Sequence, residues 1–161
     1  MLPITPTLFI GNQLDYENSV KNQPNWATVH ACKEPYHREA LGYKEKGAPK
    51  GHSEYLFAVR DNRLILNLVD SPDYRYISDV IIDKALDFID EKLRDGLNVL
   101  VHCNLGESRS PSIGLLYLVK KKILKVKTPD EAMGEFKKIY PNYAPKGIWD
   151  FIKLNWKRYI D

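Results

Sequence analysis

Residues 99–111 read VLVHCNLGESRSP, and this stretch determines the fold that we expect. The apolar run before His102 does not alternate with polar residues, which is typical of a strand covered on both faces. Ser110 and Pro111 are a favourable N-cap and first-turn pair for a helix, and Gly106 lets the intervening loop bend sharply. The stretch therefore predicts a buried strand, a tight loop and the start of a helix.

The loop in this stretch has the composition of an anion site. Backbone N–H groups of a loop that curls into a helix N-terminus form a concavity that prefers an anion. Cys103 and Arg109 are six positions apart, so the loop can bring both side chains to one bound oxyanion. The guanidinium matches two phosphate oxygens, and its field favours the thiolate, a strong nucleophile. The alternative is a buried structural cysteine beside a salt-bridging arginine.

The sequence resembles a known enzyme family at several points. Residues 102–110, HCNLGESRS, resemble the signature of the cysteine-dependent protein tyrosine phosphatase superfamily, and residues 108–112, SRSPS, resemble its dual-specificity branch. Residues 4–12 are similar to the opening strand of those domains, and residues 66–70 to the strand that delivers their general acid. The resemblance implies an α/β fold in which helices flank a central, mostly parallel, mixed sheet, with residues 1–161 as a single catalytic domain.

The resemblance also implies roles for individual residues. Cys103 would attack phosphorus, and Asp70 would protonate the leaving oxygen and then activate water. Asp73 is the rival acid, and either aspartate could instead be a turn residue beside Pro72. His102 would orient the loop, and Ser110 would hydrogen-bond the cysteine sulfur. The expected phosphate-binding loop consists of Asn104, Leu105, Gly106, Glu107, Ser108 and Arg109.

Two further residues are interpreted through the resemblance. Cys32 ends a predicted strand, where some relatives carry a second cysteine that traps the oxidised catalytic one as a disulfide. The alternative for Cys32 is a small buried apolar side chain. A Pro-Asn pair that braces the phosphate loop in the family is replaced here by Pro145 and Lys146.

Composition limits the class of protein. The chain has 161 residues, 43% of them hydrophobic, which suits one compact domain. A formal charge of +3 suits an anionic substrate but does not indicate a nucleic-acid partner. Two cysteines, no secretory leader and no apolar run long enough to span a bilayer predict a cytoplasmic protein without a transmembrane segment. We expect a monomer.

The spacing of the remaining polar residues indicates no cofactor. His30, His37 and His52 do not form ligand spacings with each other or with carboxylates, so we expect no metal. A lysine cluster at residues 120–127 is either a docking site for an acidic partner or membrane surface, or a solvated helix end.

The chain pattern predicts alternating elements around one unusual segment. Strands are predicted over 7–10, 26–32, 64–69 and 97–102, and helices over 15–21, 77–94, 111–122, 129–140 and 148–159. Residues 34–63 carry scattered glycine, proline and charged residues and are predicted to be a long loop or a loosely helical excursion, typical of a functional loop or an insertion. This segment either borders the active-site mouth and selects the substrate or is a solvated loop without a role.

The expected substrate is a phosphorylated protein, with phosphotyrosine, phosphoserine or phosphothreonine as the reacting group. A phosphoinositide or an RNA 5′-phosphate is the enzymatic alternative, although Glu107 places negative charge in the loop. A pseudophosphatase that binds phosphorylated partners without turnover is the non-enzymatic alternative.

Overall fold

A six-stranded sheet forms the centre of the computed structural model, which describes all of residues 1–161. The strands are β1 (Leu2–Pro3), β2 (Leu8–Gly11), β3 (Trp26–His30), β4 (Phe57–Arg60), β5 (Arg63–Leu66) and β6 (Asn98–His102), in the order β1-β2-β6-β3-β5-β4. Strands β2, β6, β3 and β5 run parallel, and the edge strands β1 and β4 are antiparallel to their neighbours. The prediction of a mostly parallel, mixed sheet is therefore confirmed.

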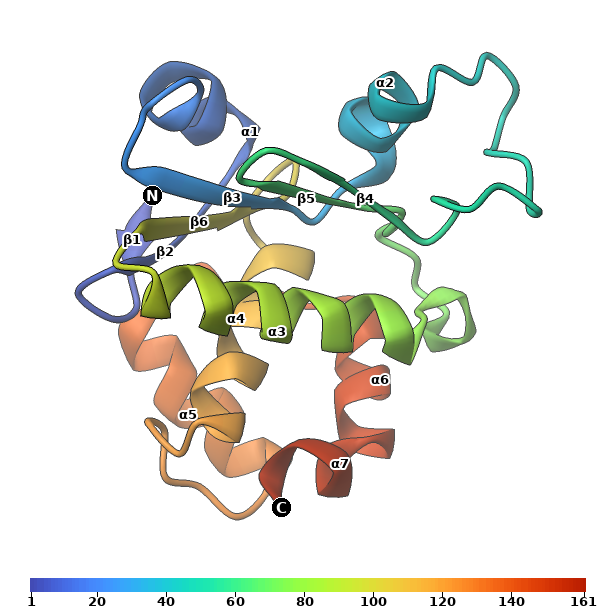
Figure 1. Ribbon diagram of the computed structural model, residues 1–161. Helices are drawn as coiled ribbons and strands as arrows, with labels where there is room; N and C mark the ends of the chain where they lie inside the picture. The colour runs from blue at the N-terminus through green and yellow to red at the C-terminus, as the bar shows by residue number, and fades with distance from the viewer.

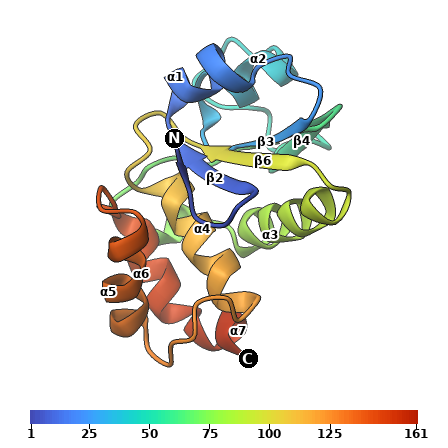
Figure 2. The same cartoon turned by 90° about the vertical axis from the view of Figure 1, so that its left-hand side faces the viewer.

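Helices cover both faces of this sheet. They are α1 (Gln13–Asp15), η1 (Tyr16–Val20), η2 (Lys33–His37), α2 (Arg38–Leu41), η3 (Tyr74–Tyr76), α3 (Asp79–Arg94), α4 (Arg109–Lys120), α5 (Pro129–Ile139), α6 (Gly147–Leu154) and α7 (Trp156–Ile160). Figure 1 and Figure 2 show α1 and α2 on one face and α3 to α7 on the other. No helix combines the length and apolarity that a membrane crossing requires.

The core follows from the apolar runs of the sequence. Val99, Leu100 and Val101 of β6 are fully buried because strands flank β6 on both sides and helices cover it. Helix α4, which follows β6, is buried along almost its whole length. Helix α3 buries one stripe, Ile81, Ile82, Ala85, Leu86, Phe88 and Ile89, as its 3.6-residue period predicts.

The prediction of a long loop over 34–63 is correct only for its middle. The segment begins within η2 and continues through α2, and it ends in β4, which pairs antiparallel with β5. The strand Phe57–Arg60 was missed because its four residues carry no clear alternation of buried and exposed positions. Residues 42–56, between α2 and β4, are the part that forms no helix or strand.

Two other predicted elements have wrong limits. The strand predicted over 64–69 ends at Leu66, because Asn67 turns away to bond Tyr55 and Leu56 through its side-chain and backbone amides. The helix predicted over 148–159 is divided into α6 and α7 at Asn155, whose side-chain amide donates to the carbonyl of Phe151.

Candidate active site

Cys103 lies directly after β6, where the parallel strands end and the loop to α4 begins. Its sulfur is almost wholly buried, and the Gly106 N–H donates to Sγ at 3.3 Å. The Ser110 hydroxyl lies 3.2 Å from Sγ and also 3.2 Å from the carbonyl oxygen of Gly11. A backbone N–H and a hydroxyl group therefore both lie within hydrogen-bond distance of the sulfur.

The loop around the sulfur is held from outside by neighbouring segments. Gly106 has φ of +74°, and a Cβ there would come within 2.9 Å of the Gly11 carbonyl oxygen, so only glycine fits without strain. The Tyr140 hydroxyl donates to the Gly106 carbonyl at 2.5 Å, and the Ala144 N–H donates to the Glu107 carbonyl at 2.7 Å. The loop shape is thus determined by the segment after α5 as well as by its own sequence.

Arg109 is buried beside the loop, and one of its three side-chain nitrogen atoms has no hydrogen-bond partner in the protein. Its Nη1 donates to the Leu68 carbonyl at 2.9 Å, and its Nη2 donates to Asn104 Oδ1 at 2.7 Å. Asn104 is itself held, because its amide donates to Gln13 Oε1 and to the Glu34 carbonyl. Arg109 Nε is a buried donor with no acceptor among the protein atoms. Such a group is rare in native proteins and indicates a ligand that accepts from it.

Seven of the predicted site residues line one small cavity, and Gly106, Ser110, His102 and Cys32 do not. The volume of the cavity is about 230 Å³, and it is lined by Asp70, Cys103, Asn104, Leu105, Glu107, Ser108, Arg109, Ala144 and Lys146. Leu105 and Glu107 are exposed at its rim. No residue of 34–63 lines this cavity, although the carbonyl of Glu34 contacts the loop through Asn104.

The two aspartates considered for the acid have different surroundings. Asp70 lines the cavity, and Lys146 Nζ lies 3.4 Å from its Oδ2. Asp73 instead precedes η3, where its carboxylate accepts from the backbone and guanidinium of Arg75. These hydrogen bonds hold the pKa of Asp73 below its usual value. Asp70 is therefore the aspartate that faces the buried sulfur and arginine.

Ser110 does not cap α4, contrary to the prediction from the Ser110–Pro111 pair. The helix begins at Arg109, one residue before the predicted cap, and the hydroxyl of Ser110 is directed to Cys103 and Gly11. The hydroxyl of Ser108 accepts the backbone N–H of Lys146 at 3.0 Å. A backbone hydrogen bond from Lys146 thus braces the loop at Ser108.

His102 is buried and points away from the cavity. Its Nδ1 lies 3.1 Å from the Cys103 carbonyl oxygen, and its Nε2 lies 2.6 Å from Nδ1 of His30. Burial lowers the pKa of His102 to about 4, so the ring is neutral at pH 7. The sequence pattern placed His30 apart from the other histidines; the tertiary structure brings it against His102.

Cys32 is a second buried thiol, and both cysteines are free. Burial raises the pKa of Cys32 to about 12, and the charge of Cys103 adds to this rise. Cys32 is therefore protonated at neutral pH, which makes it a slower nucleophile than a thiolate would be. No three His, Cys, Asp or Glu side chains gather in a way that could hold a metal ion.

Several supporting residues were not identified from the sequence. Gly11, Gln13, Leu68 and Tyr140 contact the loop or its arginine but lie 30 or more positions from the residue each contacts. Two of these contacts are made by backbone carbonyls, which carry no residue-type signal. No spacing rule along one chain connects such groups.

Comparison with known proteins gives the following matches. The family model "Dual specificity phosphatase, catalytic domain" matches residues 57–149. Dual specificity protein phosphatase 1 of Arabidopsis thaliana is 44% identical over 57 residues, which are 35% of this chain and 28% of that protein. Dual specificity protein phosphatase 5 of Rattus norvegicus is 40% identical over 65 residues, which are 40% of this chain and 17% of that protein. The matched segments thus span less than a third of these curated relatives.

Solved structures show the same fold at low identity. The crystal structure of DUSP15 has a TM-score of 0.65 with 19% identity and covers 96% of this chain and 86% of that one. The human tyrosine phosphatase-like serine/threonine/tyrosine-interacting protein has a TM-score of 0.62 with 20% identity and covers 98% of this chain and 95% of that one.

Proposed function

The chain belongs to the family of dual specificity phosphatase catalytic domains, and from this premise we propose that it hydrolyses phosphomonoesters on proteins through a phosphocysteine intermediate. The observation that supports this most directly is Arg109, which lines the same cavity as Cys103 and whose buried Nε has no protein acceptor. A phosphate oxygen would accept from Nε, as the planar guanidinium favours. We also propose that residues 1–161 act as one catalytic domain.

In the first step, the Cys103 thiolate attacks phosphorus, the S–P bond forms and the P–O ester bond breaks. Asp70 gives its proton to the departing oxygen, so the product alcohol or phenol leaves neutral. Arg109 and the N–H groups of the loop Asn104, Leu105, Gly106, Glu107, Ser108 and Arg109 bind the remaining phosphoryl oxygens and stabilise their charge. These donors are already oriented, because neighbouring segments hold the loop.

In the second step, Asp70 takes a proton from water, the water oxygen attacks phosphorus and the P–S bond breaks to release phosphate. The sulfur leaves as a thiolate, which the Gly106 N–H and the Ser110 hydroxyl stabilise. The single proton of Ser110 can be given either to Sγ or to the Gly11 carbonyl, since both lie at 3.2 Å. Ser110 can therefore donate its proton to the sulfur when the sulfur is a thiolate, and to the Gly11 carbonyl when the sulfur is neutral.

The shape and charge of the cavity favour a protein substrate. The cavity is small and its rim residues Leu105 and Glu107 are exposed, so a phosphorylated side chain on a protruding segment can reach the sulfur. The carboxylate of Glu107 at the rim disfavours a polyphosphoinositide or an RNA 5′-triphosphate, since both carry additional phosphates. Residues 34–63 do not line the cavity, so their proposed role in substrate selection is confined to segments of substrate beyond the phosphate.

One contact favours the second candidate function, a phosphate-binding module with weak turnover. Lys146 Nζ lies 3.4 Å from Asp70 Oδ2, so the carboxylate that has to act as the acid is already held in an ion pair. Lys146 is more than half exposed, so solvent weakens this effect.

Hydrolysis of p-nitrophenyl phosphate and phenyl phosphate in EDTA, from pH 5 to pH 8, tests the enzyme. We expect turnover by the native protein, none by Cys103→Ser, and a loss of about 10²- to 10⁴-fold in Asp70→Asn for phenyl phosphate, the poorer leaving group. Asp70→Asn also loses the decline in kcat/KM toward alkaline pH that deprotonation of a general acid causes.

Two outcomes separate the candidate functions. A native protein that binds vanadate but does not turn over either ester contradicts the enzyme and supports the phosphate-binding module. If Lys146→Met then restores turnover, the Lys146–Asp70 contact is the reason for the weak activity.

A further inference from the structure

Three polar side chains form a line behind the phosphate loop, on the side away from the cavity. Arg63, at the start of β5, donates from Nε to His30 Nε2 at 2.9 Å. His30 Nδ1 is 2.6 Å from His102 Nε2, and His102 Nδ1 is 3.1 Å from the Cys103 carbonyl oxygen. Because β5, β3 and β6 are adjacent strands, the line crosses the sheet from strand to strand.

The guanidinium of Arg63, at one end of this line, determines which nitrogen of each histidine carries the proton. A guanidinium can only donate, so His30 Nε2 must be the bare, accepting nitrogen. A neutral imidazole carries one N–H, so the His30 proton lies on Nδ1 and is donated to His102 Nε2. The His102 proton then lies on Nδ1, where it is donated to the Cys103 carbonyl.

The surroundings keep both rings neutral and fixed in orientation. Burial lowers the pKa of both histidines, and the positive charge of Arg63 lowers that of His30 further. Tyr16 stacks on His102 with ring centroids 5.3 Å apart, and Tyr36 stacks on His30 at 4.2 Å. Neither ring can turn over to exchange its two nitrogens without disturbing an aromatic neighbour.

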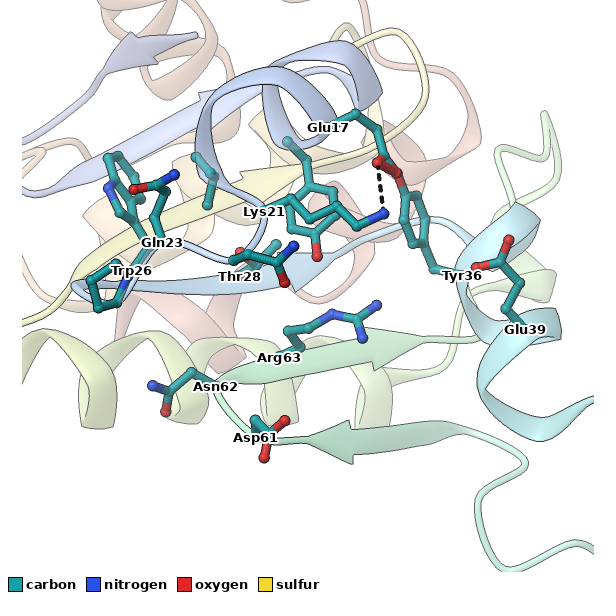
Figure 3. A pocket seen from close by; sticks show the side chains of 14 residues that line it. Glu17, Lys21, Gln23, Trp26, Thr28, Tyr36, Glu39, Asp61, Asn62 and Arg63 are labelled. Carbon is teal, nitrogen blue, oxygen red and sulfur yellow. Dashed lines mark hydrogen bonds and ion pairs between the residues drawn. The ribbon is translucent and has the colours of Figure 1, made fainter.

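Arg63 reaches this line from a second cavity. Figure 3 shows its side chain extending from β5 into the middle of a pocket lined also by Glu17, Lys21, Trp26 and Thr28. This pocket has a volume of about 450 Å³ and shares no lining residue with the cavity at Cys103. Arg63 therefore acts on the site only through the histidines.

We propose that Arg63 and His30 are positioning residues for the reaction proposed above: Arg63 selects one tautomer of the histidine pair, and this tautomer holds the Cys103 carbonyl. The inference rests on that proposed function for its catalytic consequence. The Cys103 carbonyl precedes the N–H groups of the loop, so its orientation sets where those groups point. Its partner His102 is the last member of the line.

Without the guanidinium, the histidine pair has a second arrangement. Both protons can then move to Nε2, so that His102 donates to His30 and the lone pair of His102 Nδ1 faces the Cys103 carbonyl oxygen. Two acceptors in contact repel each other, and the carbonyl rotates away. The Gly106 N–H that faces Sγ belongs to the same loop, so the thiolate loses part of its stabilisation.

Arg63→Met tests the proposal, with Arg63→Lys as the conservative variant, because lysine also only donates. Arg60→Met is the matched control, since it removes the same charge from the paired position of the β4–β5 hairpin, where Arg60 binds Glu54 rather than a histidine. The first measurement is ¹⁵N NMR of the imidazole nitrogens, which distinguishes protonated from bare nitrogen. The second is the alkylation rate of Cys103 by iodoacetate, located by peptide mass spectrometry.

In the native protein we expect Nδ1–H on both His30 and His102. In Arg63→Met we expect a second tautomer to appear and the alkylation rate and kcat to fall by roughly two- to tenfold, the equivalent of one hydrogen bond. Arg63→Lys should recover part of the loss, and Arg60→Met should match the native protein.

Three outcomes overturn the proposal: Nε2–H on His102 in the native protein, an unchanged tautomer in Arg63→Met, or an unchanged alkylation rate despite a changed tautomer. The native measurement is decisive even if Arg63→Met does not fold. Tautomers and alkylation need no turnover, so a protein that shows the expected values but hydrolyses no ester contradicts the proposed function alone.

Discussion

Cys103 and Cys32 are both buried, yet their surroundings differ in chemical character. Both side chains belong to the apolar core, but a backbone N–H and a hydroxyl face the sulfur of Cys103. Burial keeps Cys32 protonated, with a pKa of about 12. Oxidation therefore has to begin at Cys103, whose sulfur lines an open cavity.

We predict that mild hydrogen peroxide links these two residues. Peroxide oxidises Cys103 to a sulfenic acid and is reduced to water; the Cys32 sulfur then displaces the sulfenic hydroxyl, which leaves as a second water, and the disulfide forms. Mass spectrometry of unreduced peptides should show a Cys32–Cys103 pair that dithiothreitol removes. In Cys32→Ala, Cys103 should instead proceed to the sulfinic acid. Absence of the linked peptide in the native protein would contradict this prediction and show that Cys32 serves only as a small apolar core residue.

The start of α6 and the segment 70–72 hold each other in place. The Gly147 N–H donates to the Ser71 carbonyl at 3.0 Å. A Cβ on Gly147 would lie 2.5 Å from the Ser71 oxygen and 2.6 Å from the Pro72 carbonyl carbon, which are backbone atoms that cannot rotate away. A helix beginning thus sets the position of Asp70, which lies next to Ser71.

Gly147→Ala should therefore displace Asp70 and reduce kcat for phenyl phosphate by about 10²-fold, the effect of a misplacement of roughly 1 Å. The loss should be smaller for p-nitrophenyl phosphate, because p-nitrophenolate is a good leaving group and depends less on protonation by Asp70. Gly134→Ala is the control, because this glycine lies exposed in α5 with open space around it. It should leave kcat unchanged and stabilise the protein by about 1 kcal/mol against urea. Equal kcat values for Gly147→Ala and the native protein would contradict this role of α6.

The molecule as a whole buries three histidines, His30, His37 and His102, and this makes its stability depend on pH. The pKa of His102 falls from 6.5 to about 4 on folding, that of His30 falls well below 6.5, and burial also lowers that of His37. Below pH 6.5 the unfolded chain therefore binds more protons than the folded one, and acid favours unfolding.

We predict that the free energy of unfolding is constant near pH 7.5 and declines as pH falls from 6.5 to 5. Each of these three histidines contributes up to about 1.4 kcal/mol per pH unit to this decline. Urea unfolding at a series of pH values measures the slope of the free energy of unfolding against pH. The substitution His30→Gln should reduce this slope, whether or not it also changes the stability at pH 7.5. A flat profile between pH 7 and pH 5 would show that the histidines are charged in the folded protein.

The sequence by itself determined the strand, loop and helix that carry Cys103 and Arg109, because apolar runs, Gly106 and the helix period act between near neighbours. It also indicated the helix predicted over residues 77–94, which the structure places at Asp79–Arg94. These are properties of short stretches, where local geometry and burial point to one answer.

Only the tertiary structure decided which distant groups meet. His30 contacts His102 across 72 positions, Arg109 bonds Leu68 across 41, and Lys146 reaches Asp70 from the start of α6. Such contacts depend on strand order and on how helices pack against the sheet. The end of β5 at Leu66 and the strand β4 depend on such contacts as well, since Asn67 bonds Tyr55 and β4 pairs with β5, whereas the break at Asn155 accompanies a bond to Phe151 within the predicted helix.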